Sequence, residues 1–70
     1  MKTQTEHKPV LYFGIEEEDA KAYQAVVRSG IRCQFVGTMD PTVPTPVLDY
    51  RYHGYQGIKE IRRFIKRMKT

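Results

Sequence analysis

Four consecutive carboxylates, Glu16, Glu17, Glu18 and Asp19, are the densest group of side chains with chemical potential in this sequence. Carboxylates three or four residues apart share a helix face, where they can exchange protons or bind a divalent cation weakly. Acidic residues in a first helical turn are also stabilised by the helix dipole, without any chemistry. We therefore expect this cluster to begin a helix, and we predict no metal site.

Cys33 is the one cysteine of the chain, so it cannot form an internal disulfide. Its thiol can be reactive, or it can be a small apolar side chain that faces the core beside Phe35. His53 can carry a proton or bind a metal, but no second histidine or cysteine stands at ligand spacing. We expect Cys33 in the core, His53 in an exposed turn, and no catalytic residue or cofactor.

Positive charge is concentrated at the end of the chain. The chain has a net charge of +4, of which residues 51–70 contribute +6 and residues 1–50 contribute −2. Five cations of a predicted closing helix can contact a polyanion: Lys59, Arg62, Arg63, Lys66 and Arg67. A solvated helix face gives the same pattern, because cations complement a C-terminal helix dipole. We expect weak binding of nucleic acid at most, without sequence preference.

Two tyrosines add a second feature to this end of the chain. Tyr50 and Tyr52 lie two residues apart in a predicted strand, so their rings project to one face. The rings can stack on bases or on a partner, or they can pack under the last helix. The sequence leaves both interpretations open.

The elements that must position these residues follow from hydrophobic patterns. Val10–Phe13 is a wholly apolar run, typical of a strand covered on both faces. A helix is expected from Glu16 to about Ser29, closed by Gly30 in a left-handed conformation. Its predicted apolar stripe consists of Ala22, Tyr23, Val26 and Val27, with Ile15 and Asp19 one turn earlier.

The second half continues with two short strands and a helix. Ile31–Val36 alternates apolar and polar residues, which favours an edge strand, parallel to the first because a helix connects them. Val47–Tyr52 is the third predicted strand, Tyr52–Gly54 is a turn, and Tyr55–Gln56 is a minimal fourth strand. The closing helix is predicted from the spacing of Ile58, Ile61, Phe64, Ile65 and Met68.

The third predicted strand follows two prolines, Pro44 and Pro46. An X-Pro bond is the one peptide bond for which the cis form costs little, and a cis bond bends the chain at the entrance of a strand. If Val43-Pro44 were cis, Pro46 would lie inside the strand, where it could not donate to the ladder. Strand physics therefore favours Thr45-Pro46 as the cis bond.

Length and composition indicate one α/β domain over residues 10–70, preceded by a disordered tail over residues 1–9. The fold is expected to be β-α-β-β-β-α, a four-stranded mixed sheet packed with two helices. No apolar run approaches the roughly 20 residues of a membrane helix, and the first eight residues have no signal-peptide core. We expect a cytoplasmic protein with no membrane contact.

Three features share their order and spacing with a known family: an apolar first strand leading into a helix, a Thr-Val-Pro or Thr-Pro turn, and a Gly-aromatic pair before the last helix. Here they are Val10–Phe13, Thr42-Val43-Pro44 or Thr45-Pro46, and Gly54-Tyr55. From Val10 to Met68, the chain thus resembles the glutaredoxin-like branch of the thioredoxin superfamily. The family spacing favours Pro44 as the cis residue, because Gly54 lies ten positions later.

Redox-active members of this family place Cys-x-x-Cys or Cys-x-x-Ser at the start of the first helix, where this chain has Ile15 and the acidic cluster. No nucleophile stands there, so family redox activity is not expected. The resemblance instead implies a module that binds a protein or peptide in a groove beside the proline turn, bordered by Tyr12, Ile15, Pro44, Thr45 and Pro46. The alternatives are a thiol-dependent enzyme acting through Cys33 and a nucleic-acid binder using the last helix.

Overall fold

The structure, a computed structural model, describes residues 8–69. Its elements are β1 (Val10–Phe13), α1 (Glu17–Ser29), β2 (Gln34–Gly37), β3 (Val47–Tyr50), β4 (His53–Gln56) and α2 (Gly57–Lys69). The predicted order β-α-β-β-β-α is confirmed. Within residues 8–69, neither helix is long and apolar enough to cross a membrane.

The four strands form one mixed sheet in the order β2-β1-β3-β4. β1 is parallel to β2 and antiparallel to β3, and β3 is antiparallel to β4. Leu11, in the middle of β1, is paired with Phe35 on one side and with Leu48 on the other. The prediction that the second strand lies at an edge is therefore confirmed.

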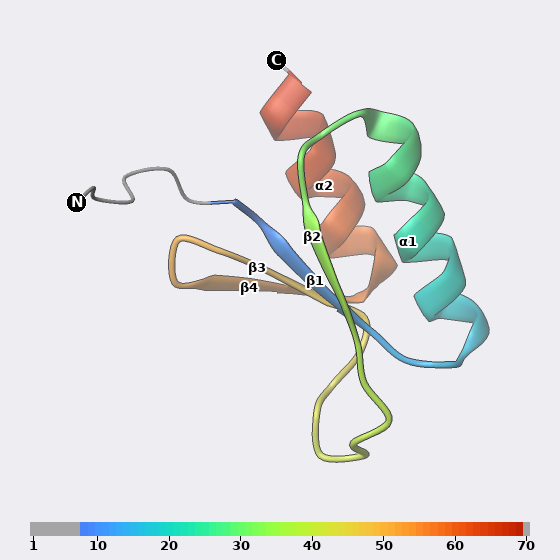
Figure 1. Cartoon of the computed structure of the whole chain (residues 1–70). Helices are drawn as coiled ribbons and strands as arrows, with labels where there is room; N and C mark the ends of the chain where they lie inside the picture. The colour runs from blue at the N-terminus through green and yellow to red at the C-terminus, as the bar shows by residue number, and fades with distance from the viewer. Residues whose placement is uncertain (1–7, 70) are drawn as a thin grey trace.

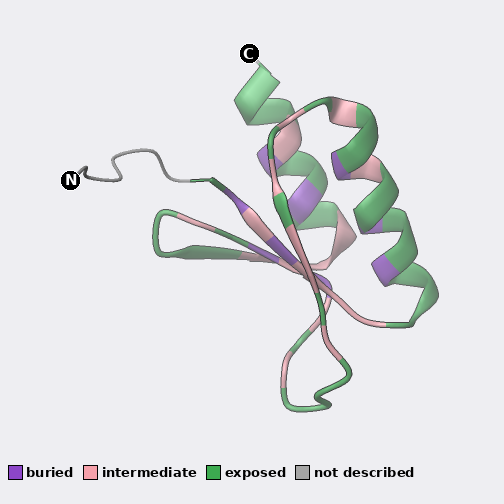
Figure 2. Cartoon of the chain, in the orientation of Figure 1, coloured by how far each residue is buried: buried purple, intermediate pink, exposed green. Residues whose placement is uncertain are grey.

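Both helices lie on one face of the sheet and contact each other there (Figure 1). The core lies between the sheet and the helices, where the buried residues gather (Figure 2). It consists of Leu11 and Leu48 from the central strands, Ala22 and Val26 from α1, and Ile61 and Phe64 from α2. A short chain thus closes its core with two layers, as its size requires.

The opposite face of the sheet is not covered by either helix (Figure 1). Side chains alternate along a strand, so Tyr12 and Val47 point away from the face that carries the buried Leu11 and Leu48. Tyr12 and Val47 are half-buried and are register partners. This uncovered face therefore exposes apolar surface at its centre.

The helix ends show how the acidic cluster is used. Glu16 is the N-cap of α1, and its backbone N–H donates to Asp19 Oδ2 at 2.9 Å. Glu18 reaches the other helix: its Oε2 accepts the backbone N–H of Ile58, 40 residues later, at 2.9 Å. The first turn of α1 therefore also caps the first turn of α2.

Four strand boundaries differ from the sequence prediction, and the smallest difference is that β2 ends at Gly37 instead of Val36. β2 begins at Gln34 instead of Ile31, because the backbone pairing with β1 starts where Gln34 N–H donates to the carbonyl of Pro9. β3 ends at Tyr50, and Arg51 and Tyr52 form the turn with φ values of 51° and 66°. Two consecutive positive φ values suit the tight twist of a two-residue hairpin. β4 accordingly begins at His53, and the predicted turn Tyr52–Gly54 is wrong.

The inward face of α1 is also rotated from the predicted stripe. Its buried residues are Asp19, Ala22 and Val26, whereas Tyr23 is 38% exposed and Val27 is 52% exposed. Tyr23 lies at the margin and packs its ring against Phe13 and Phe35. Several further predictions are confirmed: Gly30 is left-handed, α2 buries Ile61 and Phe64, and Thr45-Pro46 is the cis bond instead of Val43-Pro44.

The predicted tail covers residues 1–9, of which residues 1–7 lie outside the described part of the chain. Pro9 is buried and accepts the hydrogen bond from Gln34 N–H at 2.9 Å. The packed domain therefore begins at Pro9, one residue earlier than predicted.

Candidate functional site

The loop between β2 and β3, residues 38–46, projects from the end of the sheet (Figure 1). Asp40 organises its tip, because Asp40 Oδ1 accepts both the backbone N–H and the hydroxyl of Thr42, at 3.0 and 2.8 Å. These hydrogen bonds lower the pKa of Asp40. The Asp40 carbonyl also accepts the N–H of Val43 at 3.1 Å, so the tip returns the chain to the sheet.

A cavity of about 520 Å³ lies where this loop meets the uncovered face of the sheet. Its walls come from three strands or their ends and from the loop: Tyr12, Val36, Gly37, Thr38, Val43, Pro44, Val47 and Asp49. Most of these residues are apolar, and the single carboxylate, Asp49, belongs to β3. The chemistry of the cavity therefore favours an apolar side chain with a few polar contacts.

The five residues predicted to border a groove are divided between different places. Tyr12 and Pro44 line the cavity. Ile15 is 82% exposed and lines a separate hollow at the start of α1. Pro46 is buried, and its carbonyl accepts the N–H of Gly57 at 2.8 Å, so it supports the site without lining it.

Thr45 is half-buried and lies between these two places, beside Gly14. A Cβ on Gly14 would lie 2.8 Å from Thr45 Oγ1 and 3.0 Å from Asp19 Oδ2, so only glycine fits between them. Within residues 8–69, no hydrogen bond joins the backbone N–H or carbonyl of Thr45 to another residue. The backbone before the cis proline thus keeps its hydrogen-bonding capacity.

The cavity residues that sequence reasoning missed are Val36, Val43, Val47 and Asp49, with Gly37 and Thr38. Strand alternation places Val47 and Asp49 on one face, and that signal was present in the sequence. Val43 had no such signal, because the course of an irregular loop is set by contacts such as those of Asp40.

The acidic cluster does not form a chemical site in the described residues. Glu17 lies 4.0 Å from Lys21, Glu18 caps α2, and Asp19 caps α1. Among residues 8–69, no group of three His, Cys, Asp or Glu side chains is placed to hold a metal ion. The cluster acts as capping, the interpretation that the sequence favoured.

Cys33 is half-buried beside the core and lies just after the C-terminal end of α1. Burial raises the pKa of its thiol, and a hydrogen bond involving the backbone of Leu11 offsets this in part. The raised pKa keeps the Cys33 thiol mainly protonated at neutral pH, which makes it a weak nucleophile.

The aromatic residues near the hairpin differ from the prediction. Tyr52 lies in the turn and is fully exposed, so Tyr50 and Tyr52 do not share a strand face. Tyr50 instead packs edge-on against Phe64, with ring centroids 5.4 Å apart. His53 is exposed, as predicted, but it belongs to β4, and its ring packs against Tyr55 at a tilt, with ring centroids 4.4 Å apart.

The five cations of α2 that were predicted to contact a polyanion are all exposed. Arg63 contacts Glu60 one turn earlier, with Nη1 3.3 Å from Oε2. Arg63 and Arg67 border a hollow beside the hairpin, whereas Lys59, Arg62 and Lys66 are not among its lining residues. The five cations therefore differ in their surroundings, since two border a hollow and three do not.

In comparisons with known proteins, no family model, no curated protein and no solved structure matches the chain.

Proposed function

We propose that this chain is a redox-inactive, glutaredoxin-like module that binds an extended peptide segment of another protein. The observation that carries the proposal is the apolar cavity between Tyr12, Pro44 and Val47, next to the free backbone of Thr45. An extended peptide needs backbone partners for affinity and pockets for alternate side chains, and this region offers both.

The backbone around the site supports strand addition. β2 lies at the edge of the sheet, so its outer side has no strand partner among the described residues. Thr45, which follows the cavity residue Pro44, offers one N–H and one carbonyl. A peptide that lies along the backbone of Thr45 would place an apolar side chain between Tyr12 and Pro44.

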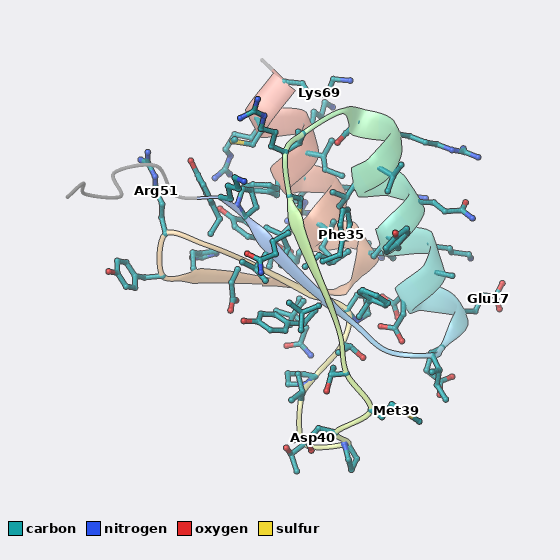
Figure 3. All side chains as sticks on the ribbon, viewed as in Figure 1. Glu17, Phe35, Met39, Asp40, Arg51 and Lys69 are labelled. Carbon is teal, nitrogen blue, oxygen red and sulfur yellow. The ribbon has the colours of Figure 1, made fainter. Side chains whose placement is uncertain are left out.

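Exposed apolar side chains near the site favour a protein segment as the ligand. Met39, at the tip of the loop, is 85% exposed, and its side chain points outward (Figure 3). Ile15, at the start of α1, is 82% exposed. Large exposed apolar side chains are a feature of surfaces that contact other proteins.

The alternative of a thiol enzyme through Cys33 has less support. Its thiol is half-buried, has a raised pKa and lines a hollow at the opposite end of α1 from Ile15. Because the pKa is raised, the thiolate fraction at neutral pH is below that of free cysteine, and it grows only as the pH passes the raised value.

A phage-displayed random peptide library, selected on the purified domain, tests the proposal. We expect extended peptides with an apolar residue to be enriched, and their binding to be lost in Pro44→Glu. Pro41→Glu is the matched control, since Pro41 is an exposed proline of the same loop that does not line the cavity. No enrichment, or equal loss in both variants, would overturn the proposal.

The thiol alternative has its own test. We expect Cys33 in the folded protein to react with a thiol reagent more slowly than free cysteine at neutral pH, and at the normal rate after unfolding in urea. Reduction of a mixed glutathione disulfide at a rate abolished by Cys33→Ala would make the protein an enzyme and contradict our proposal.

A further inference from the structure

A second cavity, of about 440 Å³, lies on the helix-covered side of the sheet, between the β3–β4 hairpin and α2. It shares no lining residue with the cavity beside the proline turn. Its walls consist of Tyr50, Arg51, His53, Tyr55, Glu60, Arg63 and Arg67. These residues come from the end of β3, the turn, β4 and one face of α2.

The floor of this cavity is a connected set of rings. Tyr55 packs against Phe64 with centroids 4.9 Å apart, and His53 lies on Tyr55 at 4.4 Å. Tyr50 contacts Phe64 from the other side. Because Phe64 is 2% exposed and belongs to the core, the outer rings are held in fixed positions. His53, the exposed member, offers a ring face to a ligand.

Three arginines surround these rings. Arg51 comes from the turn, and its guanidinium lies 5.3 Å from the centroid of the Tyr50 ring. Figure 3 shows Arg51 at the turn of the hairpin. Arg63 and Arg67 lie one helical turn apart on α2. Glu60 is the one carboxylate among the lining residues, so the cavity has a net positive charge.

The kind of cation is as informative as the charge. The lining contains arginines and no lysine, although α2 carries Lys59, Lys66 and Lys69. A guanidinium presents a planar fork that binds phosphate through two parallel hydrogen bonds, and it also stacks on rings. Fixed aromatic rings beside arginines are the groups that bind a base and its phosphate together.

We propose that this cavity binds a nucleotide, with the phosphate between Arg51 and Arg63 and the base stacked on His53 and Tyr55. The same chemistry is presented by a free mononucleotide and by one residue of a single-stranded nucleic acid. The site is independent of the peptide-binding proposal, because the two cavities have no residue in common.

Titration of the full chain with adenosine monophosphate, followed by amide proton–nitrogen correlation spectra, tests this site. We expect saturable shifts at Arg51, His53, Tyr55 and Arg63, and none at Tyr12 or Val47. Inorganic phosphate should shift the arginines and leave His53 and Tyr55 unchanged. A short single-stranded oligoadenylate distinguishes the two sources: tighter binding than the monophosphate indicates a nucleic acid, and equal binding indicates a free nucleotide.

A matched pair of variants separates the cavity from a diffuse basic helix. Arg63→Gln should weaken binding by about tenfold, since it removes a charge-assisted hydrogen bond. Arg62→Gln removes the same charge from the next residue of α2, outside the cavity, and should change affinity less than about twofold. Equal losses in the two variants, or no saturable shift with the monophosphate or oligoadenylate, would overturn the proposal. Circular dichroism should show both variants folded, because both residues are exposed.

Discussion

At the start of α1, four carboxylates occupy the four consecutive positions 16–19, and on α2 five cations lie within the nine positions 59–67. Asp19 caps α1, Glu18 caps α2, and Glu17 lies beside Lys21. Of the cations, Lys59, Arg62 and Lys66 form no ion pair within the described residues. The acidic cluster is thus used by the fold, whereas much of the basic face extends into solvent, where it is accessible to a ligand.

The physical reason lies in the backbone groups that each cluster meets. A helix N-terminus has unpaired N–H groups that need acceptors, and here two N-termini lie close enough to share one acidic cluster. The cations of α2 are spread from its first turn to its last, and a cationic side chain has no acceptor to offer an unpaired N–H group. The two charged clusters therefore differ in what they are free to bind.

The largest expected effect on stability concerns Phe64, the core residue that contacts the rings of the basic cavity. Phe64→Ala should lower the free energy of unfolding by about 3–5 kcal/mol, because it removes a buried ring that contacts Tyr50 and Tyr55. Urea denaturation followed by circular dichroism measures this loss. The same change should abolish nucleotide-dependent shifts even where the variant folds.

The control for Phe64 is Met68→Ala, one turn later in α2 and 43% exposed, with an expected loss below about 1 kcal/mol. A cooperative melt of Phe64→Ala within about two degrees of wild type would contradict the helix-on-sheet packing.

A middle-sized effect is expected within the acidic cluster itself. Glu18→Ala should lower stability by about 1 kcal/mol, because the N–H of Ile58 at the start of α2 loses its acceptor. Glu17→Ala should cost less than about 0.5 kcal/mol, since its pair with Lys21 is exposed and 4.0 Å long. Urea melts of the two variants at one salt concentration measure the difference. Equal losses would mean that the cap on α2 contributes nothing.

The smallest effect on stability is expected for a cation of α2. Arg62→Gln should change stability by no more than about 0.5 kcal/mol, because its side chain is exposed and forms no ion pair with a described residue. The same urea melts provide the measurement. A loss above about 1 kcal/mol would show that the fold also depends on the basic face, and would remove the contrast between the two clusters.

Local pattern predicted much of this molecule. Apolar runs and spacing gave the six elements in order, the edge position of β2 and the buried face of α2. Because a proline has no N–H to donate inside a sheet, the sequence favoured Pro46 over Pro44 as the cis residue, as the structure has it. These features depend on neighbours within a few residues, and the periods of strands and helices are read directly from side-chain types.

The sequence by itself therefore determined the elements, their order and the capping role of the acidic run. The tertiary structure alone decided that Glu18 serves a helix 40 residues away, that the hairpin turns at Arg51 and Tyr52, and that Val27 of α1 is exposed. It also decided which cations meet rings, since Arg51 and Arg63 come together only when the hairpin packs on α2. Contacts between distant segments depend on the packing of whole elements, and no local period encodes them.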